Sequence, residues 1–199
     1  MLAMLATAAL CPSAAAGDAE AVGAAAVHAA MDAEDGWTRV LQRDGVTVSR
    51  KAIPGLEVDA FKGTKTLDPD VDAALMFSII CDVSAHKRLS PGLVESSMVE
   101  GGPVDLTYYQ VMGSPPLLPV APRYWLITAD MEDGVGGEAG HKRRRWSSLP
   151  LDQLPEVHAR IQAEYAGAVP LPFTHGVWEL DPEPDGTTTV RYYQVSHPG

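Results

Sequence analysis

The histidines are the side chains of this sequence that could act as acids, bases or metal ligands near neutral pH. Six are present: His28, His86, His141, His158, His175 and His197. They form no His-x-x-x-His pair, no His-Glu-x-x-His motif and no Cys/His cluster with the spacing of metal ligands. The sequence also lacks a Gly-x-Ser-x-Gly nucleophile elbow, a phosphate-binding glycine loop and a dinucleotide fingerprint. We therefore predict no catalytic residue, no metal site and no cofactor.

Arg123 indicates a different chemistry, the recognition of a polar group within an apolar site. It follows a connector with four prolines between positions 115 and 122 and opens a predicted strand, in which Trp125 and Ile127 share its face. A buried guanidinium is tolerated only when it is paired or hydrogen-bonded. Two roles are therefore expected for Arg123. It either recognises a head group or hydroxyl of a ligand, or it hydrogen-bonds local backbone carbonyls or groups at the surface.

The basic run from His141 to Trp146 invites interpretation as a patch for nucleic acid or lipid head groups. The favoured interpretation is a strand whose charges alternate outward and are neutralised by the acidic loop before it. The formal net charge of the whole chain is -11, which disfavours nucleic acid and anionic membranes as main partners because phosphates require a positive field.

Length and composition predict one domain, with two small domains as the alternative, and periodicity predicts that it contains both helices and strands; the α+β class itself follows from the family resemblance described below. The 199 residues are 46% hydrophobic, enough for a sizeable core. Helices are expected at 18–31, 37–42, 68–81 with Asp68 as cap, and 152–166. Strands are expected at 46–50, at 58–66 with a bulge or bend around Phe61 and Gly63, on both sides of the proline connector, and in a hairpin over 176–195.

Several blocks, in order from Trp37 to Gly199, resemble the START family of helix-grip lipid-transfer domains. They are a Trp followed by Asp44-Gly45 and a strand, the Asp82 to Pro91 loop, the strand, proline connector and Arg123, and the Gly-x-Trp strand with its Gly-Thr turn at 176–187. The chain departs from the family pattern at three places. Tyr124 replaces an Asp, Leu89-Ser90 stands where many relatives have a Trp, and His197 replaces the Asp of Asp-Pro-Gly.

The resemblance implies a curved antiparallel sheet that grips a long C-terminal helix around a hydrophobic tunnel. The chain ends at Gly199, where that helix would begin, so we expect a fold truncated before it. The implied function is non-enzymatic binding, and possible transfer, of a lipid, a sterol or a similar hydrophobic ligand. In some sterol-binding relatives a buried acid pairs with the strand-opening Arg; the matching residue here is the neutral Gln110. The expected cavity residues are Tyr109, Gln110, Arg123, Trp125, Ile127, Trp178 and Tyr193.

Two other functions are compatible with the same residues. One is a polyketide cyclase or aromatase, which uses a few polar groups in a similar pocket, because a fold alone does not determine function. The other is an interaction domain with a filled core, or a truncated domain. The expected partner is a hydrophobic small molecule. We expect no binding of nucleic acid and no transmembrane span. Transient contact with a membrane is possible, and the sequence does not indicate an oligomeric state.

Residues 1–17 are apolar and rich in Ala, with small residues at 14–16 that suit a cleavage site. No Lys or Arg precedes Arg39, although a signal peptide normally begins with positive charge. Residues 1–17 are therefore interpreted as a signal peptide or an Ala-rich leader before a domain at 18–199. If residues 1–17 are a cleaved signal peptide, the protein is expected in the periplasm or outside the cell. If they are not, it is expected in the cytoplasm.

Overall fold

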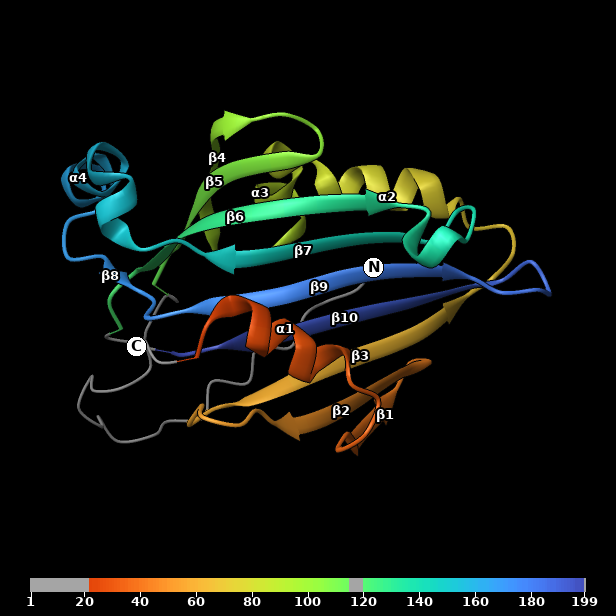
Figure 1. Cartoon of the computed structure of the whole chain (residues 1–199). Coiled ribbons are helices and arrows are strands. Elements are labelled where there is room, and N and C mark those ends of the chain that lie inside the picture. The colour runs from red at the N-terminus through yellow and green to blue at the C-terminus, as the bar shows by residue number, and fades with distance from the viewer. Residues whose placement is uncertain (1–21, 115–119, 199) are drawn as a thin grey trace.

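Strands dominate the computed structural model, which describes residues 22–114 and 120–198. Ten strands form one sheet in the order β1-β2-β3-β10-β9-β7-β6-β5-β4, all antiparallel, with β8 added parallel to β6 (Figure 1). The predicted leader at 1–17, the start of the predicted helix at 18–31 and most of the proline connector lie outside the described residues. The last described element is β10, and no helix follows it in the part of the chain that the structure describes.

The elements have the following bounds. The strands are β1 (Thr38–Arg43), β2 (Val46–Ala52), β3 (Asp59–Leu67), β4 (Leu93–Gly101), β5 (Asp105–Met112), β6 (Arg123–Asp133), β7 (Lys142–Ser148), β8 (Val169–Pro170), β9 (Thr174–Pro182) and β10 (Thr188–Ser196). The α-helices are α1 (Ala24–Asp32), α2 (Ala73–Cys81), α3 (His86–Leu89) and α4 (Pro155–Glu164). Short 3-10 turns are η2 (Val83–Ala85), η3 (Val135–Gly137) and η4 (Leu151–Gln153).

Side chains alternate along each strand, so the sheet has two faces with different cover. We call the face that carries Tyr108, Ile127 and Trp146 the inner face; η2 packs against it through Val83. The opposite, outer face is covered by α1 and α4 in two separate apolar clusters. Figure 1 shows α1 lying across β9 and β10. It shows α4 at the left of the view, near β8 and the left ends of β6 and β7.

The outer face holds the best packed part of the core. Val27 and Met31 of α1 are fully buried against Val177 of β9 and Tyr193 of β10. Burying side chains of this size contributes roughly 1.5–3 kcal/mol each. The α1 helix therefore contributes directly to the stability of the sheet.

The α4 helix docks on the outer face through one apolar stripe and one polar contact. Val157 and Ile161 are buried, as expected from the predicted helix at 152–166, and they pack against Tyr124 of β6. The Tyr124 hydroxyl lies 2.6 Å from Nδ1 of His158 and also accepts a hydrogen bond from Gln162. Burial raises the pKa of Tyr124, so the hydroxyl stays neutral.

We expect Tyr124→Phe to lower the free energy of unfolding by about 1–2 kcal/mol, because His158 and Gln162 lose their shared partner. Urea denaturation of the purified protein measures the change. Tyr165→Phe is the matched control, since its hydroxyl makes only a 3.4 Å contact with Glu95. Equal losses in the two variants would contradict the importance of the Tyr124 contact.

Three local predictions are wrong. Residues 37–42 are not helical: β1 pairs with β2 through the Asp44-Gly45 turn, whose φ values of 52° and 76° match a tight hairpin. The cap of α2 is Asp72, whose Oδ1 accepts from the Leu75 amide at 2.9 Å, not Asp68. Finally, β3 pairs without a register shift at Phe61 or Gly63, so of the expected bulge or bend the bulge is absent.

Candidate ligand-binding site

The inner face of the sheet is lined by aromatic side chains. Tyr192 of β10 lies between two tryptophans, with ring centroids 5.7 Å from Trp146 and 4.4 Å from Trp178. Trp125 lies on the same face further along β6, and it is partly exposed like Trp178 and Tyr192. Partly exposed aromatic side chains on one face are the surface that an apolar ligand needs.

A chain of hydrogen bonds crosses this face below η2 and α3. His86 Nε2 lies 2.8 Å from the Ile80 carbonyl oxygen and therefore carries the proton. Its Nδ1 accepts from the Gln110 amide at 2.9 Å, and the Gln110 oxygen accepts from the Trp125 indole at 3.0 Å. The Gln110 amide also donates to Ser96. Gln110 is thus fixed by three neighbours and orients Trp125.

This chain requires a neutral His86. Burial lowers the pKa of His86, although its bond to the Ile80 carbonyl acts in the opposite direction. A second proton, on Nδ1, would point at the Gln110 amide and break that bond. We interpret the chain as a positioning network for the aromatic face.

Arg123 lies at the rim of the inner face. Its Nε donates to the Pro198 carbonyl at 3.2 Å and its Nη1 donates to the Ala121 carbonyl at 3.1 Å. Of the two roles expected for Arg123, the structure shows hydrogen bonding to backbone carbonyls. Gln110 faces Trp125 across the two strands, whereas Arg123 faces Met112, so the two residues that match the acid and the Arg of some relatives do not face each other.

The predicted cavity residues divide between the two faces of the sheet. Gln110, Arg123, Trp125, Ile127 and Trp178 fall on the inner face by strand register. Tyr109 and Tyr193 fall on the outer face, where they are buried in the α4 and α1 clusters respectively. The structure therefore brings five of the predicted residues to one face and separates two from them.

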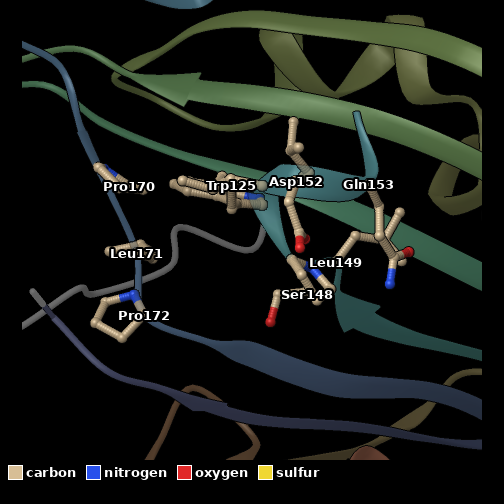
Figure 2. A pocket seen from close by; sticks show the side chains of 11 residues that line it. Trp125, Ser148, Leu149, Asp152, Gln153, Pro170, Leu171 and Pro172 are labelled. Carbon is tan, nitrogen blue, oxygen red and sulfur yellow. The ribbon is translucent and has the colours of Figure 1, made fainter. Parts of the chain in front are cut away.

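A pocket of about 570 Å³ opens beside Trp125 at the β8 end of the sheet (Figure 2). Figure 2 shows the return segment at 170–172 facing Leu149 across this space. Most of the lining is Pro and Leu, with Ser148, Asp152 and Gln153 as polar groups. The pocket adjoins the aromatic inner face through Trp125.

A second pocket, of about 670 Å³, lies between α2 with η2 and the sheet. Its walls include Phe77 and Cys81 of α2, and Leu106 and Met131 of the inner face. The α2 helix is apolar, yet none of its residues is buried, and Leu75 remains 56% exposed. The helix thus stands over the sheet with space beneath it.

Arg144 is a residue of this site that the sequence did not reveal. Its neighbours Arg143 and Arg145 face outward and pair with Glu179 and Asp32, as expected for alternating charges. Arg144 instead faces inward and is only 1% exposed. Its Nη1 donates to the Ile80 carbonyl, and its guanidinium lies 5.3 Å from the Tyr108 ring.

One group of potential metal ligands occurs in the described ranges: Glu138, His141 and Asp181, whose ligand atoms lie within 4.8 Å of one another. Arg191 already pairs with Asp181 at 2.8 Å, and the buried Glu179 accepts from His141 at 2.9 Å and from Arg143 at 2.7 Å. Most of these groups are already hydrogen-bonded or paired with one another, so we interpret them as an ion-pair network on the outer face.

No known protein-family profile matches this sequence, and no curated protein matches it by sequence. Solved structures do match its fold. The STAR-related lipid transfer protein of Xanthomonas axonopodis (fragment 25–204) is 24% identical with a TM-score of 0.66, over 83% of this chain and 84% of that one. Human STARD10 is 16% identical with a TM-score of 0.66, over 84% of this chain and 64% of that one.

Human StAR-related lipid transfer protein 5 is 15% identical with a TM-score of 0.64, over 87% of this chain and 80% of that one. These likenesses show the class: the chain has the START-like helix-grip α+β fold, as its sequence blocks predict. Within residues 22–114 and 120–198, no helix is long and apolar enough to cross a membrane.

Proposed function

We propose that this protein binds a hydrophobic small molecule, such as a lipid or sterol, on the inner face of its sheet, without catalysing a reaction. The observation that carries the proposal is that three partly exposed aromatic side chains, Trp125, Trp178 and Tyr192, share the inner face of the sheet, which two pockets adjoin. The solved structures with this fold include lipid transfer proteins, which supports the same class of ligand.

The polar groups of the face favour binding over chemistry. His86, Gln110 and Trp125 use their donors and acceptors on one another and on the backbone. A general base needs a lone pair directed at a substrate, whereas Nδ1 of His86 is occupied by the Gln110 amide. Their arrangement supports a rigid aromatic surface for an apolar ligand.

Quenching of tryptophan fluorescence by a neutral brominated long-chain alcohol tests the proposal. Bromine quenches only indoles close to it, so binding on the inner face should quench the wild-type protein at low micromolar ligand. In Trp178→Phe we expect a clearly smaller fraction of the signal to be quenched, because this partly exposed indole lies on the face.

Trp37→Phe is the matched control. Trp37 packs with the α1 cluster on the outer face, so its removal should leave the quenching of the other tryptophans in place. Absence of saturable quenching in the wild-type protein, together with native mass spectra that show no adduct with lipids or sterols, would overturn the proposal.

A further inference from the structure

Resting on the proposed function, we infer that the pocket between α2 and the sheet takes an amphipathic ligand with an anionic head group, a carboxylate or a phosphate, and that Arg144 binds this head group. The apolar part of the ligand then lies between the pocket-lining side of α2 and the inner face of the sheet. Arg144 is thereby a ligand-binding residue, and not only a cap for a helix.

The charge of Arg144 is incompletely compensated within the described chain. Its side chain is 1% exposed, and its Nε and Nη2 atoms are buried without a hydrogen-bond partner. The described ion pairs include the adjacent Arg143 and Arg145 and do not include Arg144. Its contacts are all with groups that carry no full negative charge: the Ile80 carbonyl, at the negative end of the α2 dipole, the Tyr108 side chain and the Cys81 thiol. A buried cation without an anion is costly, so an anionic ligand would be stabilised here.

Arg144 adjoins the inner end of the pocket. Met131, its register partner on β6, and Lys142, two residues earlier on the same face of β7, both line the pocket. Cys81 lines it as well, and the guanidinium is close enough to oppose the rise that burial causes in the pKa of its thiol. Tyr108, whose ring faces the guanidinium, is two residues from Leu106 in the pocket wall.

The remaining walls determine the rest of the ligand. Phe77, Val83, Leu106 and Met98 offer apolar surface around the pocket. Leu75 and Ile79 of α2 are 56% and 40% exposed, so the helix presents further apolar surface beside it. Lys142 in the pocket wall pairs with Asp133 at 2.6 Å, and Asp82 also lines the pocket, so Arg144 is the cation left to bind an anionic head group. An anionic head and an apolar chain complement this combination.

Calorimetric titration of the full chain with three ligands of equal chain length tests the inference: dodecanoate, dodecyl phosphate and dodecanol. We expect both anions, or one of them, to bind about tenfold more tightly than dodecanol, the usual gain from a charged hydrogen bond. The tighter of the two anions identifies the source as a fatty-acid carboxylate or a phospholipid-type phosphate. Arg144→Met should remove the preference, so that dodecanoate, dodecyl phosphate and dodecanol bind this variant with similar affinities.

Arg145→Met is the matched control, because Arg145 lies on the same strand but pairs with Asp32 on the outer face; it should keep the full preference. Equal affinities for the three ligands in the wild-type protein would overturn the inference and leave the proposed function intact. Failure of dodecanol and both anions to bind would also overturn the inference, and the quenching and native mass spectra described above then decide whether the proposed function stands.

A second measurement covers the case in which Arg144→Met does not fold. Cys81 lines the pocket next to the guanidinium, so dodecanoate bound there should slow alkylation of Cys81 by iodoacetamide at least several-fold, as followed by peptide mass mapping. Binding of dodecanoate with unchanged Cys81 alkylation would place the head group elsewhere and overturn the role of Arg144.

Discussion

Gly176→Ala is expected to destabilise the protein by about 3 kcal/mol or more, the upper part of the range for overpacking a core. Gly176 lies on the inner face of β9, opposite Trp146 of β7. A methyl group at this position would overlap the six-membered ring of Trp146 and lie 2.5 Å from the Tyr193 carbonyl oxygen. Trp146 is 8% exposed and stacks on Tyr192, so the ring has little room to move.

Thermal unfolding followed by circular dichroism measures this effect, and a fall of roughly 10 °C in Tm is expected for a chain of this size. Gly63→Ala is the matched control. Gly63 lies on the same face in β3, and a methyl group there would only reach Val46 at an ordinary 3.9 Å. Similar Tm values for the two variants would show that the Trp146 ring does not require the glycine.

The strands and their order along the chain could be predicted because their signals are local. Asp44-Gly45 and Pro184-Asp185-Gly186 mark tight turns, and alternating β-branched and aromatic residues flank them. The sequence predicts a helix at 37–42 in place of β1 because Trp37, Val40 and Leu41 also fit the apolar stripe of a helix. In the structure β1 is an edge strand whose residues are all exposed, so pairing with β2 decides its conformation, and burial does not.

The face of each site residue could not be predicted from the sequence. Tyr108 and Tyr109 are adjacent and equally apolar, so alternation places one on each face without saying which face is covered by a helix. The positions of α1 and α4 decide this, because both cover the outer face and bury Tyr109 and Tyr193 there. The local sequence pattern of a strand therefore does not predict which of its faces a distant helix covers.

The same limit applies to Arg144. In sequence it is one of three consecutive arginines, and nothing distinguishes it from its neighbours. Only the register of β7 with β6 and β9 places it inward, toward the end of α2. Trp146 shares the parity of Arg144, but one aromatic residue in a strand of charged and polar side chains does not determine which face that parity takes.

The second large expected effect is a loss of stability in mild acid. We expect the free energy of unfolding to fall as the pH is lowered from 6.5 toward 4.5, because three histidines are held neutral by the fold. Burial lowers the pKa of His28, His86 and His175, in the last case to about 4, with nearby His28 adding to the effect. For His175 the change from 6.5 to about 4 corresponds to roughly 3 kcal/mol.

The direction follows from proton binding. Below pH 6.5 the unfolded chain binds protons at these histidines while the folded chain does not, so acid favours unfolding. The stabilisation is complete above 6.5 and is lost as the pH falls toward the folded-state pKa. Carboxylates such as Glu179, whose pKa the fold lowers through Arg143 and His141 against the effect of burial, add their own acid sensitivity only below about pH 4.5.

His175→Leu separates this histidine from the others. His175 is 7% exposed, stacks on Phe173 and has an unpartnered Nδ1, so a leucine can take its place without losing a hydrogen bond at that atom. Urea denaturation from pH 7 to 4.5 should show a flatter stability curve for His175→Leu, ending above the wild type by roughly 2 kcal/mol. Val177→Ala, on the same face of β9, should lower stability by a constant amount at every pH. Parallel curves for His175→Leu and the wild type would mean that His175 is not the group that titrates.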